Sequence, residues 1–253
     1  MMALQDWNEE SLFSRTALLL GSEAMQRLAG ARVILFGVGG VGSWCAEGLV
    51  RSGIGHLTLV DPDRISPTNV NRQLMATCRT IGQVKVEALR DRLQEIHPEA
   101  DIIAIQSAYN AETAAGFDLN AYDVVIDAID SLKDKARLIL DASASAARFY
   151  SSMGSALKTD PTQIRVAEFW DVRGCPLGSA LRKKLRKDKT LPEKPFLCVY
   201  DSEVLENRGA PVDPAAEPGY AKKAVTNGTL APITGIFGFT LAALIIQDLT
   251  LIR

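Results

Sequence analysis

Short apolar runs alternate with stretches of helical period along the first part of the chain. The apolar runs have the length of buried strands and span 33–36, 57–60, 101–106 and 123–127. Between them, apolar positions three and four residues apart predict helices over 41–51, 84–96 and 133–146. Strands that alternate with helices are typical of parallel βαβ units, in which helices cover both faces of the sheet. We therefore predict an α/β fold with a Rossmann-like, doubly wound sheet.

The pattern changes in the second part of the chain. Residues 162–170 alternate between apolar and polar, which predicts a half-exposed strand, and we expect a mixed sheet. Residues 174–218 are rich in proline, glycine and charge, and we predict a long irregular segment of the kind that is usually functional or mobile. The stretch 225–247 has no charged residue and is long enough to span a membrane. Because glycines and Pro232 interrupt it, we predict a turn followed by a buried helix over 232–249, with no stable membrane insertion.

A glycine-rich turn follows the first predicted strand and opens the first helix. Its sequence is G-V-G-G-V-G, with glycines at Gly37, Gly39, Gly40 and Gly42. Glycines at these positions permit a tight turn, a close approach of the backbone to phosphate, and close packing of helix on strand. The unpaired amides that open the helix then face anionic oxygens. Asp61 ends the next strand, where its carboxylate can accept hydrogen bonds from ribose hydroxyls, so the pattern predicts a nucleotide site.

The residues that follow Asp61 favour ATP over a dinucleotide. Hydride transfer has no obvious need for cations there, whereas nucleotidyl transfer must neutralise a triphosphate and the departing pyrophosphate. Arg72 offers a planar fork of donors and Lys85 a point charge. Asn69 and Gln73 offer neutral contacts to the same ligand. Taken alone, these residues are also compatible with a polar loop followed by a solvated helix.

Composition and net charge exclude fewer classes of function than these motifs do. The chain has 253 residues, of which 47% are apolar and 23% charged, which is typical of a globular protein. A net charge of -2 and a pI near 5.8 indicate no particular partner. The 4 cysteines form no C-x-x-C pair, so we expect no zinc site, no disulfide framework, and reduced thiols in the cytoplasm. The N-terminus is acidic and lacks the apolar segment of a secretory signal.

One stretch departs from this overall charge balance. Positive residues are concentrated in one short run, at Arg182, Lys183, Lys184, Arg186, Lys187 and Lys189. Such a run can bind a phosphate backbone, although most charge runs are solvated helix faces. Because no aromatic residue is interleaved with these positions, we expect contact with the backbone of a nucleic acid and no stacking on its bases.

The motifs together resemble the E1-like adenylating superfamily, which includes the MoeB and ThiF proteins. The likeness lies in the G-x-G-G-x-G turn, the stretch D-x-D-x-x-x-x-x-N-x-x-R-Q from Asp61 to Gln73, and the downstream Lys85. It implies one ThiF-type domain over 1–253. In that domain 31–146 would be the nucleotide-binding half, and 147–253 would be the half that binds substrate and forms a dimer.

The resemblance also implies a role for several single residues. Asp63 would join the ATP-binding set, and a carboxylate at the end of the fourth strand would hold magnesium with the ATP. Asp130 is the candidate for that carboxylate, with Asp127 as the alternative. An arginine of the N-terminal helix, here Arg15, would reach the ATP of a partner subunit, so the resemblance implies a homodimer. Arg15, Arg72 and Lys85 would then be the catalytic residues.

Four segments resemble one branch of the superfamily, the tRNA threonylcarbamoyladenosine dehydratases. They are 15–21, 124–131, 154–165 and 232–239. The branch implies ATP-dependent dehydration, by cyclisation, of N6-threonylcarbamoyladenosine at position 37 of tRNA through adenylation of its carboxylate. The partner would be the anticodon loop of a tRNA, and the basic residues of 182–187 would contact that RNA.

Other functions remain open at this point. The chain can be read as an enzyme that adenylates the C-terminus of a ubiquitin-like sulfur carrier, although many such enzymes have two C-x-x-C zinc pairs. It can also be read as an NAD-dependent oxidoreductase, which the glycine turn alone supports. Cys175 or Cys198 would matter if the reaction needed a thiol that captures an acyl group. A monovalent cation, and partners such as a cysteine desulfurase or a sulfur-acceptor protein, are also left open.

Overall fold

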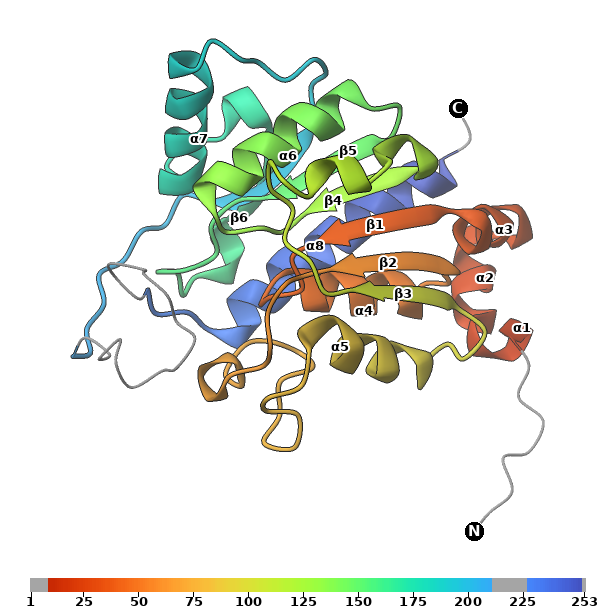
Figure 1. The fold of residues 1–253 in the computed structure, drawn as a ribbon. Coiled ribbons are helices and arrows are strands. Elements are labelled where there is room, and N and C mark those ends of the chain that lie inside the picture. The colour runs from red at the N-terminus through yellow and green to blue at the C-terminus, as the bar shows by residue number, and fades with distance from the viewer. Residues whose placement is uncertain (1–8, 211–226, 252–253) are drawn as a thin grey trace.

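The structure is a computed structural model that describes residues 9–210 and 227–251, and its centre is a sheet of seven strands. The strands are β1 Arg32–Phe36, β2 His56–Val60, β3 Asp101–Ile105, β4 Val124–Asp127, β5 Arg148–Ser152, β6 Ile164–Glu168 and β7 Leu197–Asp201. The helices are α1 Glu9–Leu12, α2 Ser14–Leu20, α3 Ser22–Gly30, α4 Gly42–Arg51, α5 Lys85–Gln94, α6 Leu132–Ala144, α7 Pro176–Lys187 and α8 Ala231–Thr250. Figure 1 shows their arrangement.

The sheet has the order β3-β2-β1-β4-β5-β7-β6. Every neighbouring pair is parallel except β6 and β7, which are antiparallel. The chain adds strands on one side of β1 through β2 and β3, and then on the other side through β4 and β5. The carboxyl ends of β1 and β4 therefore form the switch point at which doubly wound sheets bind ligands. The predicted doubly wound mixed sheet is confirmed.

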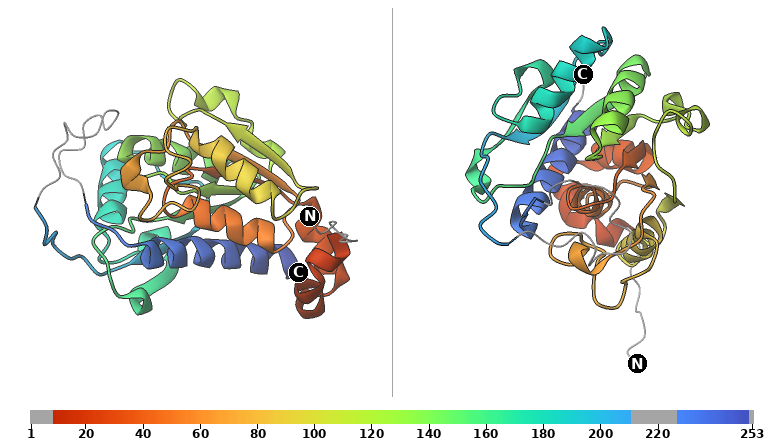
Figure 2. Two further views of the ribbon diagram at one scale, coloured as in Figure 1. Left: turned by 90° about the horizontal axis from the view of Figure 1, so that it is seen from below. Right: turned by 60° about the vertical axis from the view of Figure 1, so that its left-hand side comes forward.

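Two apolar layers enclose the sheet. One contains Leu49 of α4, Leu89 of α5 and Phe237 of α8, and the other contains Leu138 of α6 and Leu181 of α7. The views in Figures 1 and 2 agree that α4, α5 and α8 cover one face and that α6 and α7 cover the other. The strands between them read as continuous apolar runs because both of their faces are buried.

The last helix, α8, is part of the core. By length and composition alone it is apolar enough to cross a membrane, with a mean hydropathy of 1.6 over its most apolar window. However, it lies along α4 and contacts β5, and half of that window is buried. A Cβ added to Gly238 would lie 2.5 Å from the carbonyl oxygen of Val41, so glycine allows the two helices to approach closely. The prediction of a buried helix over 232–249 is confirmed in position and in packing.

The irregular segment predicted over 174–218 is wrong in two places. The helix α7 and the strand β7 both lie within it. Leu181 and Leu185, one helical turn apart, bury one side of α7 against the protein, although proline, glycine and charge surround them. Residues 211–218 of the predicted segment lie outside the described residues, as do 225 and 226 of the uncharged stretch.

Candidate nucleotide-binding site

The glycine turn lies at the switch point, between the end of β1 and the start of α4. Gly37 has φ +88°, and a Cβ there would lie 2.7 Å from the carbonyl oxygen of Ala128. A Cβ on Gly42 would lie 1.9 Å from the carbonyl oxygen of Gly37. Neither position has room for a larger residue. Within the described chain, no side chain caps the first amides of α4, which leaves the helix N-terminus available to an anion.

Asp61 connects the second strand to this turn. Its Oδ2 accepts a hydrogen bond from the backbone amide of Val38 at 2.9 Å, and its Oδ1 accepts one from the amide of Asp63 at 3.0 Å. Lys85, also buried, donates from Nζ to Asp63 Oδ2 at 2.8 Å and lies 3.9 Å from Asp61 Oδ1. Burial raises the pKa of Asp61 above its ordinary value, and the positive charge of Lys85 offsets part of that rise. The predicted ribose acceptor and the predicted cation therefore lie side by side.

The segment after Asp61 returns to the glycine turn. The backbone carbonyl of Arg72 accepts a hydrogen bond from Trp44 Nε1 of α4 at 3.1 Å, and Cγ of Arg72 would lie 3.4 Å from a Cβ on Gly40. The guanidinium donates to the carbonyl of Thr68 at 2.8 Å and to Asn71 Oδ1 at 2.9 Å, so its contacts in this structure lie within its own loop. The structure thus brings the backbone and Cγ of Arg72 to the glycine turn, and the contact of its guanidinium with phosphate stays a prediction.

Gln73 and Asn69 differ in what they offer a ligand. Gln73 Nε2 would lie 3.9 Å from a Cβ on Gly39, and Gln73 Oε1 is buried with no hydrogen-bond partner among the described residues. An orphaned buried acceptor beside a glycine turn is consistent with a missing ligand. Asn69 is also buried, but its Oδ1 accepts a hydrogen bond from the amide of Ser66 and closes the loop.

Two carboxylates follow β4, and they differ in environment. Asp127 is fully buried, and its Oδ2 accepts hydrogen bonds from Lys135 Nζ at 2.7 Å and from Ser151 Oγ at 2.8 Å. Lys135, equally buried, also donates to the carbonyl of Ile129 at 3.1 Å. These contacts occupy Asp127, whereas Asp130 is exposed. Magnesium is commonly held by one or two carboxylates and the phosphates of the nucleotide, so Asp130 remains the better candidate ligand.

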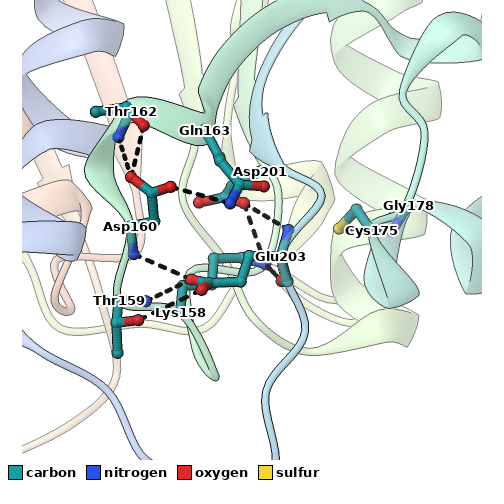
Figure 3. Close-up of polar contacts among 9 residues, drawn as sticks. All are labelled: Lys158, Thr159, Asp160, Thr162, Gln163, Cys175, Gly178, Asp201 and Glu203. Atoms are coloured by element: carbon teal, nitrogen blue, oxygen red, sulfur yellow. Dashed lines mark hydrogen bonds and ion pairs between the residues drawn. The ribbon is translucent and has the colours of Figure 1, made fainter.

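A second polar group lies further along the same edge of the sheet, where β7 ends (Figure 3). Asp201 is fully buried; its Oδ1 accepts a hydrogen bond from the amide of Glu203 at 2.6 Å and lies 4.0 Å from Lys158 Nζ. The Glu203 carboxylate accepts hydrogen bonds from the amides of Thr159 and Asp160, which ties the loop after β5 to the chain after β7. Sequence reasoning missed these residues and Lys135. A signal was present for Asp201, which ends an apolar run as Asp61 does.

The remaining candidates lie elsewhere on the molecule. Arg15 is exposed on α2, and the basic residues Arg182, Lys183, Lys184, Arg186 and Lys187 lie on α7. Cys175 is fully buried, and its Sγ accepts a hydrogen bond from the amide of Gly178 at the start of α7 (Figure 3). Cys198 is buried within β7, where burial raises its pKa well above the ordinary value. Neither thiol is exposed for acyl capture.

The geometry has the elements of a nucleotide site, and known proteins identify its family. The ThiF family profile matches residues 13–252 of the chain. The chain belongs to the ThiF family.

This ThiF-family chain is similar to curated tRNA threonylcarbamoyladenosine dehydratases. It is 42% identical to that of Bacillus subtilis over 70% of this chain and 69% of the relative. It is 35% identical to that of Haemophilus influenzae over 96% of this chain and 94% of the relative.

Comparison with solved structures also finds a similarity to a tRNA threonylcarbamoyladenosine dehydratase. The crystal structure of the E. coli tRNA N6-threonylcarbamoyladenosine dehydratase TcdA in complex with ATP matches with a TM-score of 0.83 and 31% identity. The match covers 95% of this chain and 94% of that one, and a complex of the same protein with AMP matches equally well. The predicted E1-like fold is therefore confirmed, while the roles of single residues in this chain stay predictions.

Proposed function

We propose that this protein dehydrates N6-threonylcarbamoyladenosine at position 37 of tRNA in an ATP-dependent reaction. The observation that carries the proposal is similarity along almost the whole chain to a dehydratase whose crystal contains ATP. The glycine turn, Asp61 and the orphaned acceptor of Gln73 support a nucleotide at the corresponding place. ATP is accordingly the co-substrate.

The chemistry follows from what the residues present can stabilise. The carboxylate of the threonylcarbamoyl group attacks the α-phosphorus of ATP and expels pyrophosphate, which gives an acyl-adenylate. An internal nucleophile of the same group then attacks the acyl carbon, the ring closes, and AMP leaves, so the net change is loss of water. The turn amides, Arg72 and Lys85 balance the charge that develops on the phosphates. This scheme requires no protein thiol, in agreement with the burial of Cys175 and Cys198.

The finer parts of the proposal concern the metal and other ions. Asp130 would hold magnesium, which would neutralise charge on the phosphates when bound. Asp127 would act indirectly, because its pairing with Lys135 shapes the loop on which Asp130 lies. A monovalent cation and association with a cysteine desulfurase or sulfur-acceptor protein stay predictions without support from these contacts. A cytoplasmic location is consistent with a tRNA substrate.

We also propose a homodimer in which Arg15 completes the site of the partner subunit. The supporting observation is the surface of α2, which buries none of its described side chains in the single chain. Leu18 and Leu19, next to Arg15 on this helix, are 87% and 83% exposed. Adjacent leucines that remain this exposed are typical of a surface that another chain covers.

The decisive experiment is mass spectrometry of adenosine 37. Purified protein, ATP and magnesium are incubated with tRNA that contains N6-threonylcarbamoyladenosine, and the nucleoside is expected to lose the mass of one water while AMP and pyrophosphate form. Unchanged nucleoside would reject the proposal. ATP–pyrophosphate exchange driven by a glycine-tailed carrier protein, and not by this tRNA, would instead establish the carrier-activating function. Tight NAD binding without affinity for ATP would establish the oxidoreductase.

A further inference from the structure

The helix α7 has one buried and one strongly basic side. Gly178, Leu181 and Leu185 are buried and face the protein interior. The rest of its surface carries the five basic residues, Arg182, Lys183, Lys184, Arg186 and Lys187, and Figure 1 shows α7 at the end of the sheet toward which the parallel strands point. The glycine turn lies at the same end, so an RNA on α7 would be on the side of the molecule where the nucleotide binds.

A pair of aromatic residues lies against this helix, although no aromatic residue is interleaved with the basic residues in the sequence. The short 3-10 turn Phe169–Asp171 places Phe169 and Trp170 beside α7. The guanidinium carbon of Arg186 lies 5.1 Å from the centre of the Trp170 ring, and that of Arg182 lies 5.9 Å from the centre of Phe169. Phe169 is fully buried and contacts Trp170 edge-on at 5.1 Å, whereas Trp170 is half-buried. The indole is therefore fixed in place and partly open to solvent.

Three arginine side chains lie around this indole. Arg173 donates from Nη1 to the carbonyl of Trp170 at 2.6 Å, and Arg182 donates from Nη1 to the carbonyl of Phe169 at 3.0 Å. Burial lowers the pKa of Arg182, and the charges of Arg173 and Arg186 lower it further. Two carboxylates are also close: Asp171 Oδ1 lies 3.5 Å from Arg173 Nη2, and Glu168 Oε2 accepts a hydrogen bond from the amide of Trp170 at 2.7 Å. Three guanidinium groups face these two carboxylates, so an excess of positive charge is left that a bound phosphate would balance.

We propose that Trp170 and Arg186 form a stacking site for one unpaired base of an RNA strand, and that Arg173 and Arg182 bind the phosphate next to that base. This inference rests on the proposed tRNA substrate. It replaces the expectation of backbone contact without stacking, because Trp170 comes to the basic helix from a separate turn. A flat aromatic ring beside a flat guanidinium suits a flat ligand. An acidic protein segment would need the charges alone and would gain nothing from the indole.

The test compares single-stranded and double-stranded RNA on the full-length protein. The probe is a fluorescein-labelled RNA with the sequence of an anticodon loop, used alone or annealed to its complement, and binding is followed by anisotropy. Trp170→Ala is expected to weaken binding of the single strand about tenfold or more, because a base stacked on an aromatic residue contributes that much. Binding of the duplex, whose bases are not available for stacking, should not change. Trp170→Phe should retain most of the affinity for the single strand.

Lys183→Ala is the matched control on the same helix, because Lys183 is exposed and the cation–π contacts found in the described structure with Phe169 and Trp170 come from Arg182 and Arg186. It removes charge alone, so it should weaken both probes by the same factor and reduce the salt dependence. Arg186→Ala removes a charge as well as one side of the stacking site, so it should weaken the duplex as Lys183→Ala does and weaken the single strand more than that. Thermal unfolding and ATP binding report whether each variant is folded.

Three outcomes would overturn the proposal. The first is an unchanged affinity of Trp170→Ala for the single strand. The second is an equal loss for both probes in that folded variant. The third is competition by polyglutamate as effective as competition by the RNA strand. In turnover, Trp170→Ala should raise KM for the modified tRNA and leave kcat unchanged. If wild-type protein failed to convert adenosine 37, the proposed function would fall, whereas the oligonucleotide comparison would still decide the stacking site.

Discussion

At the scale of single residues, Asp61 connects three parts of the candidate site. It accepts the amide of Val38 in the glycine turn and lies beside Lys85. Its pKa is raised by burial, so it becomes protonated at a higher pH than an ordinary aspartate. A protonated carboxyl loses the charge that would strengthen its hydrogen bonds to ribose hydroxyls. Affinity for ATP should therefore be highest above this pKa and fall as the pH falls through it.

Replacing Asp61 with asparagine tests this dependence. Near neutral pH, wild type should bind ATP about tenfold more tightly than Asp61→Asn, as expected for the loss of hydrogen bonds to a charged acceptor. The ratio of the two affinities, measured by calorimetry, should approach one as the pH is lowered, since both proteins then present a neutral group. Because the protonation of ATP itself affects both affinities equally, it cancels in their ratio. A ratio that stayed constant over the whole acidic range in which both proteins remain folded would show that ionised Asp61 does not bind the ribose.

Arg72 is expected to act on the phosphates and to leave the fold unchanged. Its side chain is half-buried beside Gly40, and Arg72→Ala should reduce AMP formation about 100-fold or more, the usual effect of losing one preorganised donor to developing charge. Arg64 provides the control, because it is exposed on the same connection and donates to the carbonyl of Gly82. Arg64→Ala should retain turnover. Near-normal turnover in folded Arg72→Ala would remove Arg72 from the mechanism.

Substitutions that affect the two carboxylates at the end of β4, Asp127 and Asp130, should differ in whether they change stability or activity. Lys135→Met leaves Asp127 buried without its cation and should lower the free energy of unfolding by about 3–5 kcal/mol. Asp130→Ala changes an exposed residue and should alter stability by less than about 0.5 kcal/mol, yet it should raise the magnesium concentration that half-maximal AMP formation requires. Urea denaturation and magnesium titration measure the two effects. If the magnesium dependence of Asp130→Ala were unaltered, a group other than Asp130 would have to be the metal ligand.

The residues of the site differ in how far the sequence predicts them. The glycines and Asp61 are predictable because each occupies a fixed place in a strand–turn–helix unit, and that local spacing determines their geometry. Lys135 is not, because a lysine on an amphipathic helix usually faces solvent. Its burial follows from the position of Asp127 on the adjacent strand. Asp201 and Lys158 come together across the loop that follows β5, a long-range contact that spacing does not encode.

At the scale of elements, α8 shows how close packing depends on one position. A Cβ on Gly238 would lie 2.5 Å from the carbonyl oxygen of Val41 and 2.8 Å from the amide nitrogen of Cys45, both in the backbone at or near the start of α4. Gly238→Ala should therefore push the helices apart and lower the free energy of unfolding by about 1–3 kcal/mol. Because α4 begins at the glycine turn, affinity for ATP should fall as well.

Gly235 in the same helix is the matched control. A Cβ there would lie 3.8 Å from the ring of Trp44, an ordinary contact distance. Gly235→Ala should leave stability unchanged or raise it by up to about 1 kcal/mol, because alanine favours a helix more than glycine does. Chemical denaturation of both variants measures the contrast. Equal stability of the two variants would mean that α4 and α8 can move apart at no cost.

The helices and strands were predictable where the pattern of apolar residues was strong and differed clearly from that of the neighbouring segments. Both faces of β1, β2 and β4 are buried, so their apolar runs stand out from the helices beside them. The helix α7 was missed because Pro176 and Gly178 open it and charge covers most of its surface. The pair Leu181 and Leu185 was the available signal. The aromatic residues against α7 come from a separate turn, which a search restricted to the basic run cannot find.

At the scale of the whole molecule, the single chain is an incomplete site if the dimer proposal holds. Arg15 lies on α2 at the end of the sheet opposite to the glycine turn in Figure 1, on a helix with no buried side chain of its own. An arginine placed there cannot reach ATP in the same chain without a large movement. In a symmetric dimer, by contrast, each α2 can approach the site of the other chain.

Mixed dimers decide whether Arg15 acts across the interface. One chain carries Arg15→Ala and the other Asp130→Ala, and two affinity tags isolate dimers that contain one of each. If Arg15 acts on the partner's ATP, the Arg15→Ala chain has an intact Asp130 and receives Arg15 from its partner, so one of the two sites is complete. The assay uses magnesium well below the concentration that Asp130→Ala requires, so that each homodimer of a single variant is nearly inactive. About half of wild-type AMP formation per mixed dimer is then expected.

The reciprocal arrangement reverses the expectation and serves as the control. Here a chain with both substitutions is paired with a wild-type chain. Action across the interface leaves the wild-type site without Arg15 and the other site without Asp130, so this dimer should be inactive. Action within one chain would leave the wild-type site complete and would give about half of the full activity. Activity in the reciprocal dimer but not in the first would place Arg15 in its own chain's site, and α2 would then have to move toward the glycine turn when ATP binds.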